Sequence, residues 1–253
     1  MSVLSVVPAT ESQIQQATAL AQQYGWPLLG VGAPCPTPLL LWVGRDGYAL
    51  KSGDQKRQNP ITAKLTAGAI PPSGPESWVR GQPLARAVGI KGSNLPSVLD
   101  ATAGLGGDGW LMARMGCEVI LAERVALMAL LLSDGLQQAK RDPERHDVAQ
   151  RLTLHTNDAR QVMQTLPDPV EVIYLDPMFP HEGKGSLPRK AMVALRQLAG
   201  DDQDLPELFD QAMATAQRRV VLKRPLKAPL LTQAKPNFQL KGRSTRFDVY
   251  TTG

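Results

Sequence analysis

Short apolar runs alternate with longer amphipathic stretches from about residue 82 to the end of the chain. Runs with the length of a strand cover residues 97–100, 118–122, 151–155, 170–175 and 220–222. Patterns typical of helices cover residues 109–115, 125–139, 159–166, 188–198 and 205–216. Strands that alternate with helices predict a parallel sheet with right-handed crossovers. A terminal pair of strands, 237–241 and 246–251, completes a mostly parallel α/β arrangement.

The first part of the chain has a different pattern. Residues 11–24 predict a mostly polar helix, and residues 39–43 an apolar strand. The segment from Gly44 to Gly47 is typical of a hairpin turn. Residues 67–75 are rich in proline and glycine, as linkers are. We therefore expect a small α+β module over residues 1–75 and a larger domain over residues 76–253.

Composition narrows the class of protein. The 253 residues have a formal charge of +5, and nine Lys and Arg but no Asp or Glu fall between Arg218 and Arg246. This basic tract is suited to contact phosphates. The two cysteines form no metal-binding spacing, so we expect neither a metal site nor a disulfide. Without a signal peptide or an apolar run long enough for a membrane span, we expect a cytoplasmic protein, with a monomer as the default.

A glycine-rich turn follows the strand at 97–100, in the segment Asp100-Ala-Thr-Ala-Gly-Leu-Gly-Gly-Asp108. Gly104, Gly106 and Gly107 allow the backbone to turn tightly and to approach a ligand closely. Nicotinamide enzymes place a pyrophosphate on such a turn. Here the flanking carboxylates of Asp100 and Asp108 would repel a pyrophosphate, whereas they would attract an ammonium group. The turn therefore favours S-adenosylmethionine (SAM) over NAD.

Polar residues at the ends of the next two strands support the same cofactor. Glu123 is placed to accept hydrogen bonds from both ribose hydroxyls. Arg124 follows it and is expected to lie against the adenine or the ribose. Asn157 and Asp158 are expected to contact the adenine amino group. Together with the glycine turn, these positions predict a Rossmann-like class I SAM-dependent methyltransferase fold.

The segment Asp176-Pro-Met-Phe-Pro180 follows the strand at 170–175 and predicts the reaction. An exocyclic amine of a nucleic-acid base is a poor nucleophile, because its lone pair is delocalised into the ring. Hydrogen bonds from the amine to the Asp176 carboxylate and the Pro177 carbonyl would localise that pair, and proline holds the carbonyl in place. Phe179 offers a flat face on which the base can stack. Alignment of donor and acceptor then supplies much of the rate, without a metal.

Basic residues beyond this motif are candidates for contacts with RNA phosphates. Lys184 and Arg189 lie in a glycine-containing loop, and the other candidates lie in the basic tract. The candidates in the tract are Lys223, Arg224, Lys241 and Arg243.

Five segments together resemble the RsmJ family of bacterial SAM-dependent methyltransferases. They are Asp100–Gly106, Gly89–Gly92, Tyr174–Pro180, Val221–Pro225 and Arg246–Tyr250. The resemblance covers about residues 80–253, and Asp-Pro-Met-Phe-Pro is the family's own form of the motif. It implies methylation of the exocyclic N2 amine of a guanine in small-subunit (16S) ribosomal RNA, free or within the small ribosomal subunit. It also implies SAM contacts at Gly107, Asp108, Glu123, Arg124, Asn157, Asp158 and Asp176.

Three alternatives remain open at this point. A pocket that methylates an amine does not by itself distinguish guanine from adenine, so an adenine-N6 methyltransferase acting on DNA or RNA is the first. A non-catalytic RNA-binding factor for ribosome assembly is the second, although the complete Asp-Pro-Met-Phe-Pro motif argues against it. A nicotinamide-dependent oxidoreductase is the third.

Overall fold

The computed structural model describes residues 2–54, 60–63, 65, 82–177, 193–194, 197–198 and 204–252. These residues form two compact units. The first unit contains residues 2–54, 60–63 and 125–138 together with the described residues between 181 and 201. The second contains residue 65 and residues 82–124, 139–177 and 204–252. The predicted linker at 67–75 lies outside the described residues.

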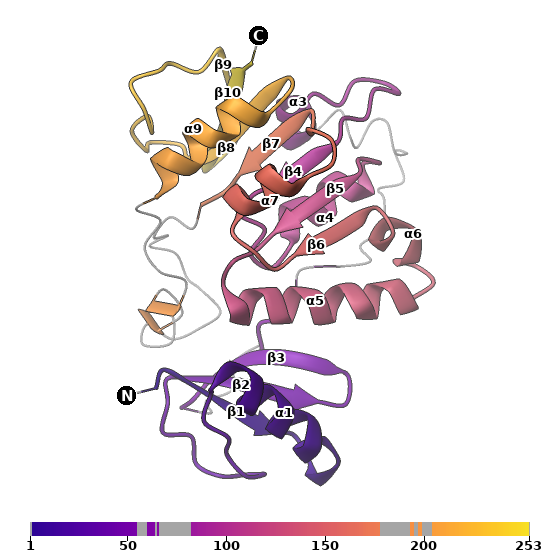
Figure 1. Ribbon diagram of the computed structural model, residues 1–253, viewed down its shortest axis with the longest axis vertical. Coiled ribbons are helices and arrows are strands. Elements are labelled where there is room, and N and C mark those ends of the chain that lie inside the picture. Colours follow the sequence, from indigo (N-terminus) through magenta and orange to yellow (C-terminus); the bar gives the residue numbers. More distant parts are fainter. Residues whose placement is uncertain are drawn as a thin grey trace. The chain divides into compact units, whose positions relative to one another are not determined.

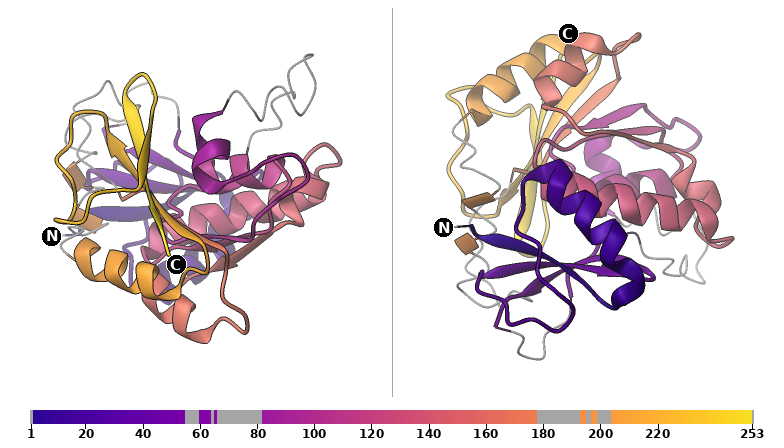
Figure 2. Two further views of the ribbon diagram at one scale, coloured as in Figure 1. Left: turned by 90° about the horizontal axis from the view of Figure 1, so that it is seen from above. Right: turned by 60° about the horizontal axis from the view of Figure 1, so that its bottom comes forward.

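The first unit is built on a three-stranded sheet in the order β1-β2-β3. Strand β1 (Leu4–Pro8) is parallel to β2 (Leu39–Gly44), which forms an antiparallel hairpin with β3 (Gly47–Ser52). A 3₁₀ turn, η1 (Glu11–Gln13), leads into helix α1 (Ile14–Tyr24), which packs on β1 (Figure 2). The predicted helix and hairpin are confirmed. Strand β1 was not predicted, because its short apolar run has no periodicity that separates a strand from a helix.

Most of helix α5 (Ala126–Arg141) also belongs to the first unit. The Asp134 carboxylate Oδ2 accepts a hydrogen bond from the Tyr48 backbone N–H at 2.8 Å, at the start of β3. Gly47 precedes it with a φ of 112°, a conformation that glycine adopts readily. A Cβ at Gly47 would overlap the side chains of Gln138 and Asp134, so glycine permits this close contact between the hairpin and α5.

The second unit is built on a seven-stranded sheet in the order β6-β5-β4-β7-β8-β10-β9. The strands are β4 (Val98–Asp100), β5 (Val119–Ala122), β6 (Leu152–His155), β7 (Val172–Leu175), β8 (Arg219–Pro225), β9 (Phe238–Lys241) and β10 (Thr245–Thr251). Strands β4 to β8 are parallel, whereas β10 is antiparallel to both neighbours. This order is the predicted Rossmann-like arrangement. The chain crosses from one side of β4 to the other between β6 and β7, and ligands bind at such a switch point, beyond the carboxyl ends of the strands.

Helices cover both faces of this sheet (Figure 1). The helices are α3 (Pro83–Val88), α4 (Gly107–Arg114), α6 (His146–Ala149), α7 (Ala159–Thr165) and α9 (Leu205–Thr215). Helices α7 and α9 pack on each other in front of the sheet in Figure 1, and α3 and α4 lie behind it. The predicted helix at 188–198 falls largely outside the described residues.

One apolar core of the second unit lies between the sheet and helices α7 and α9. Its members alternate along β8, where Val220 and Leu222 face this core. Strand periodicity therefore turns Val221 and Lys223 toward the opposite face. No helix in the described part of the chain is long and apolar enough to cross a membrane.

Candidate functional site

The glycine turn joins the carboxyl end of β4 to the start of α4. Gly104 and Gly106 have φ values of 54° and 78°, so both adopt the left-handed conformation that glycine allows at low cost. Among the described residues, the atom nearest to a Cβ placed on Gly104 would be the Thr102 carbonyl oxygen at 4.0 Å, so these residues leave the space beside the turn open. Gly107 is the first residue of α4.

Glu123 follows β5 and lies against this turn. Its side chain is buried, with 8% of the residue exposed. The carboxylate Oε2 accepts a hydrogen bond from the Gly104 backbone N–H at 2.7 Å. The structure therefore brings together two elements of the predicted cofactor site that are 19 residues apart in sequence.

Lys223 contacts two carboxylates, Asp108 and Asp176, near the ends of β4 and β7, and the buried Asp100 carboxylate interacts electrostatically with both of them. We call the group of Asp100, Asp108, Asp176, Tyr174 and Lys223 the acidic centre. The Lys223 ammonium lies 2.7 Å from Asp108 Oδ2 and 2.8 Å from Asp176 Oδ2. The Tyr174 hydroxyl donates a hydrogen bond to Asp108 Oδ2 at 2.6 Å. Helix α4 and strands β4, β7 and β8 each contribute to this centre.

Burial and charge shift the pKa values within the acidic centre. Burial raises the pKa of Asp100 well above its ordinary value, and the Asp108 carboxylate adds to the effect. Burial also raises the pKa of Asp176, against the opposing charge of Lys223. Burial by itself would lower the pKa of Lys223, but Asp176 and Asp108 outweigh it and the pKa is raised. Lys223 therefore stays a cation, beside carboxyl groups whose pKa values are raised.

Asp176 is fixed to the glycine turn through its backbone. Its N–H donates a hydrogen bond to Thr102 Oγ1 at 2.6 Å, which links the end of β7 to the residue two positions after Asp100. Pro177 is buried directly behind it. The predicted stacking residue Phe179 lies outside the described residues. The structure thus joins the first residue of the Asp-Pro-Met-Phe-Pro segment to the glycine turn.

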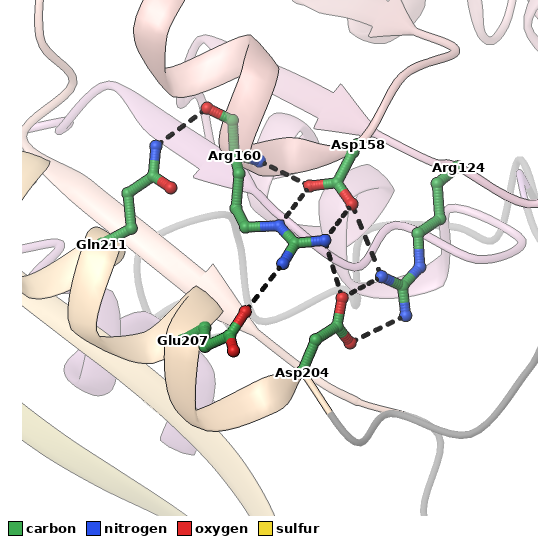
Figure 3. Close-up of polar contacts among 6 residues, drawn as sticks. All are labelled: Arg124, Asp158, Arg160, Asp204, Glu207 and Gln211. Atoms are coloured by element: carbon green, nitrogen blue, oxygen red, sulfur yellow. Dashed lines mark hydrogen bonds and ion pairs between the residues drawn. The ribbon is translucent and has the colours of Figure 1, made fainter.

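A second group of charges lies at the ends of β5 and β6 and at the start of α9 (Figure 3). We call Arg124, Asp158, Arg160, Asp204 and Glu207 the ionic cluster. Arg160 Nη2 lies 2.7 Å from Asp158 Oδ2 and 2.8 Å from Asp204 Oδ2. Arg124 Nη2 donates to Asp204 Oδ1 at 3.1 Å, and Arg124 Nη1 lies 3.5 Å from Asp158 Oδ2. Arg124 and Asp158, both predicted cofactor contacts, therefore lie together at this edge of the sheet.

Asp158 also caps helix α7. Its Oδ1 accepts a hydrogen bond from the Arg160 backbone N–H at 2.9 Å. The hydrogen bonds from the Arg160 guanidinium lower the pKa of Asp158 to about 2. Its neighbour Asn157 is exposed. The carboxylate of Asp158 is therefore engaged in holding α7 and the ionic cluster, while the adenine contact of Asn157 and Asp158 stays a prediction.

Replacing Asp158 by alanine is expected to destabilise the protein by about 1–2 kcal/mol, because α7 loses its N-cap. Asp158→Asn keeps a capping oxygen and should lose less. Because the pKa of Asp158 is lowered on folding, the ionised side chain stabilises the fold fully above the ordinary value of about 3.9, and this contribution is lost as the pH falls toward about 2. Urea unfolding at pH 7 and pH 3 measures both effects. A loss of stability for Asp158→Ala that is as large at pH 3 as at pH 7 would contradict this prediction.

The predicted RNA contacts that the structure describes divide into three sets. Lys241 is exposed at the end of β9, and Arg243 is exposed in the turn that follows, so phosphate contact there stays a prediction. Arg224 is only 5% exposed, and its Nη2 donates to the Pro229 carbonyl at 3.0 Å, so its contact with phosphate also stays a prediction. Lys223 points into the acidic centre instead of lying on an outer basic face.

Lys184 and Arg189 fall outside the described residues. Sequence reasoning missed the roles of Thr102, Tyr174, Arg160 and Asp204 in these two groups. A signal existed for Tyr174, since it carries a polar group within an otherwise apolar strand. No local signal marked Arg160 or Asp204, because their contacts join α7 to the start of α9.

The residues at this edge fit SAM. The open space beside Gly104 adjoins a buried carboxylate, Glu123, suited to a pair of ribose hydroxyls. The carboxylates of the acidic centre are suited to a positively charged ligand such as a sulfonium with its ammonium group. Among the described residues, no group of three or more His, Cys, Asp or Glu side chains is arranged to hold a metal ion.

Comparisons with known proteins agree with this chemistry. A family model described as "Putative SAM-dependent methyltransferase" matches residues 30–252. The chain is 70% identical to ribosomal RNA small subunit methyltransferase J of Magnetococcus marinus over 253 residues, 100% of both chains. It is 45% identical to the protein of that name from Thioalkalivibrio sulfidiphilus, over 99% of this chain and 98% of the relative.

A solved structure agrees as well. The crystal structure of a SAM-dependent methyltransferase from Neisseria gonorrhoeae is 30% identical, with a TM-score of 0.72. It covers 98% of this chain, and the match spans 96% of that protein. The likeness therefore includes the N-terminal part of the chain, which the sequence resemblance over residues 80–253 left out. The chain is a SAM-dependent methyltransferase with SAM as its cofactor, and it belongs to the RsmJ family.

Proposed function

We propose that this protein transfers a methyl group from SAM to the exocyclic N2 amine of a guanine in small-subunit ribosomal RNA. The observation that carries the proposal is the position of Asp176. Asp176 follows the end of β7, and its backbone N–H is hydrogen-bonded to Thr102 in the glycine turn. A methyl donor beside the turn and a base amine at Asp176 would therefore meet at one edge of the sheet. The names of the relatives, ribosomal RNA small subunit methyltransferase J, support ribosomal RNA as the substrate.

The protein's own groups would act by alignment and hydrogen bonding. Asp176 and the Pro177 carbonyl would accept hydrogen bonds from the two amine protons, which keeps the nitrogen lone pair directed at the donor. SAM, when bound, supplies an electrophilic methyl group. As the nitrogen–carbon bond forms, the carbon–sulfur bond breaks and its electron pair stays on sulfur. The amine then loses one proton, and the Asp176 carboxylate is the acceptor available for it.

The substrate is a base within RNA, which must leave its stack to reach this edge. Unstacking costs a few kcal/mol. Phosphate contacts at the exposed Lys241 and Arg243 would offset part of this cost, as would Lys184 and Arg189. Strand β9 and its turn to β10 are the described elements that offer such contacts.

Methyl transfer to defined substrates tests the proposal. Purified protein is incubated with SAM carrying a labelled methyl group and with small ribosomal subunits, or free small-subunit RNA, from a strain that lacks this methyltransferase. Nucleoside analysis should find the label in N2-methylguanosine. Label in N6-methyladenosine would replace guanine by adenine as the target. The absence of transfer to either substrate, with SAM bound, would support a non-catalytic RNA-binding factor.

Glu123→Ala is expected to weaken SAM binding by about 10- to 150-fold, since each lost hydrogen bond to a charged group is worth about 1.5–3 kcal/mol. Isothermal calorimetry measures the affinity. Glu118→Ala is the matched control, because Glu118 is exposed just before β5. An affinity for SAM that is equal in the two variants would remove Glu123 from the cofactor site.

A further inference from the structure

Lys223 occupies an unusual position for a member of a basic tract. It lies on β8, 115 residues from Asp108 and 47 residues from Asp176, yet its ammonium contacts both carboxylates. Its side chain is 23% exposed, compared with 35% for Asp176. A phosphate of the RNA backbone would have to compete with two carboxylates already within hydrogen-bonding distance. This geometry favours a role inside the reaction site.

The charges around Asp176 explain why a cation is needed there. Asp100 faces it from β4, Asp108 from α4 and Tyr174 from its own strand. Three carboxylates crowded in a partly buried space repel one another, and one of them takes up a proton unless a positive charge offsets the repulsion. Lys223 is the cation that contacts Asp176 among the described residues.

Protonation of Asp176 would be costly for the proposed reaction. A protonated carboxyl donates one hydrogen bond and accepts weakly, whereas the amine needs a strong acceptor. Lys223 binds Oδ2 of Asp176, so Oδ1 is the oxygen offered to a substrate. The Lys223 ammonium also binds Asp108. Asp108 accepts a hydrogen bond from the Tyr174 hydroxyl as well, so Lys223 is positioned by two carboxylates, one of which is itself held in place.

We propose that Lys223 is a positioning residue for the methyl acceptor. Its ammonium keeps Asp176 ionised and holds one carboxylate oxygen, so that the other accepts a hydrogen bond from the base amine. This inference rests on the proposed function for the identity of the amine, but not for the pairing of Lys223 with Asp176. It replaces the expectation that Lys223 binds an RNA phosphate.

The test compares pH profiles of kcat for the wild type, Lys223→Met and Lys223→Arg. Without the ammonium, the pKa of Asp176 rises further, so the acidic limb of the Lys223→Met profile should move to higher pH by about 1–3 units. The factor by which Lys223→Met lowers kcat should therefore be at least about ten times larger at pH 6 than at pH 9. Lys223→Arg keeps the charge and should keep the acidic limb of the wild type. KM for RNA should change less than about twofold in both variants, because positioning of Asp176 acts on the reaction step.

Two controls separate this role from a structural one. Lys140→Met makes the same substitution at an exposed position near the end of α5 and should leave kcat and its pH profile unchanged. Calorimetry with SAM and thermal unfolding monitor folding of each variant. Should Lys223→Met fail to fold, Lys223→Gln removes the charge with a polar side chain and is measured in its place.

Two outcomes overturn the inference. A raised KM for RNA with an unchanged kcat profile would return Lys223 to phosphate binding. Equal losses in Lys223→Met and Lys223→Arg, without a shift of the acidic limb, would leave only a packing role. The proposed function is judged separately by the methylated nucleoside that the wild type produces. Labelled adenosine together with a shifted Lys223→Met profile would refute the guanine target and keep the role of Lys223.

Discussion

Replacing Asp176 by alanine is expected to lower kcat for methyl transfer by about 10²- to 10⁴-fold, because the base amine loses its acceptor at the reacting nitrogen. Asp176→Asn keeps a carbonyl oxygen and should lose less. Lys223 retains its contact with Asp108 in both variants, so the acidic centre stays neutralised. Radiometric transfer to small-subunit RNA, at saturating SAM, measures the effect.

SAM affinity is the control for this variant. Asp176 is itself one of the predicted SAM contacts, but its loss should change the dissociation constant for SAM by a smaller factor than it changes kcat, since Glu123 and the glycine turn are intact. Thermal unfolding shows whether the fold is preserved. Activity of Asp176→Ala within tenfold of the wild type would show that the end of β7 does not hold the acceptor amine.

Removal of one partner of the Arg246–Asp248 pair is expected to destabilise the protein by about 3–5 kcal/mol, because a buried charge is left without its counter-ion. Arg246 Nε donates to Asp248 Oδ1 at 2.9 Å, and Asp248 is fully buried. The same guanidinium donates to the carbonyls of Leu226 at 2.9 Å and Ala228 at 2.7 Å, in the segment after β8. Arg246→Met therefore also releases this segment.

Chemical unfolding of three variants tests the pair. Asp248→Ala and Arg246→Met should each show the full loss in the free energy of unfolding. The double variant Arg246→Met with Asp248→Leu should recover part of it, since neither charge of the pair is left without the other. Arg243→Met, in the exposed turn before β10, should lie within about 0.5 kcal/mol of the wild type. Losses in the two single variants that simply add in the double variant would indicate that the charges are not coupled.

Local patterns in the sequence determined most of the sheet. Strands β4 to β10 and the glycine turn follow from apolar periodicity and from the conformations that glycine allows, both of which act over a few residues. The acidic residues Glu123 and Asp176 could be placed for the same reason. Each directly follows an apolar run, and the carboxyl ends of parallel strands share one edge.

Only the tertiary structure decided the roles of the basic tract. Its sequence contains no acid, so charge alone predicted an outer surface for phosphates. The strand order instead sets β8 beside β7, and strand alternation turns Lys223 toward Asp108 and Asp176. Arg246 turns inward to a carboxylate two residues away that pattern reading does not pair with it. Sheet order and burial determine which residues far apart in sequence come into contact. A local sequence pattern contains information on neither.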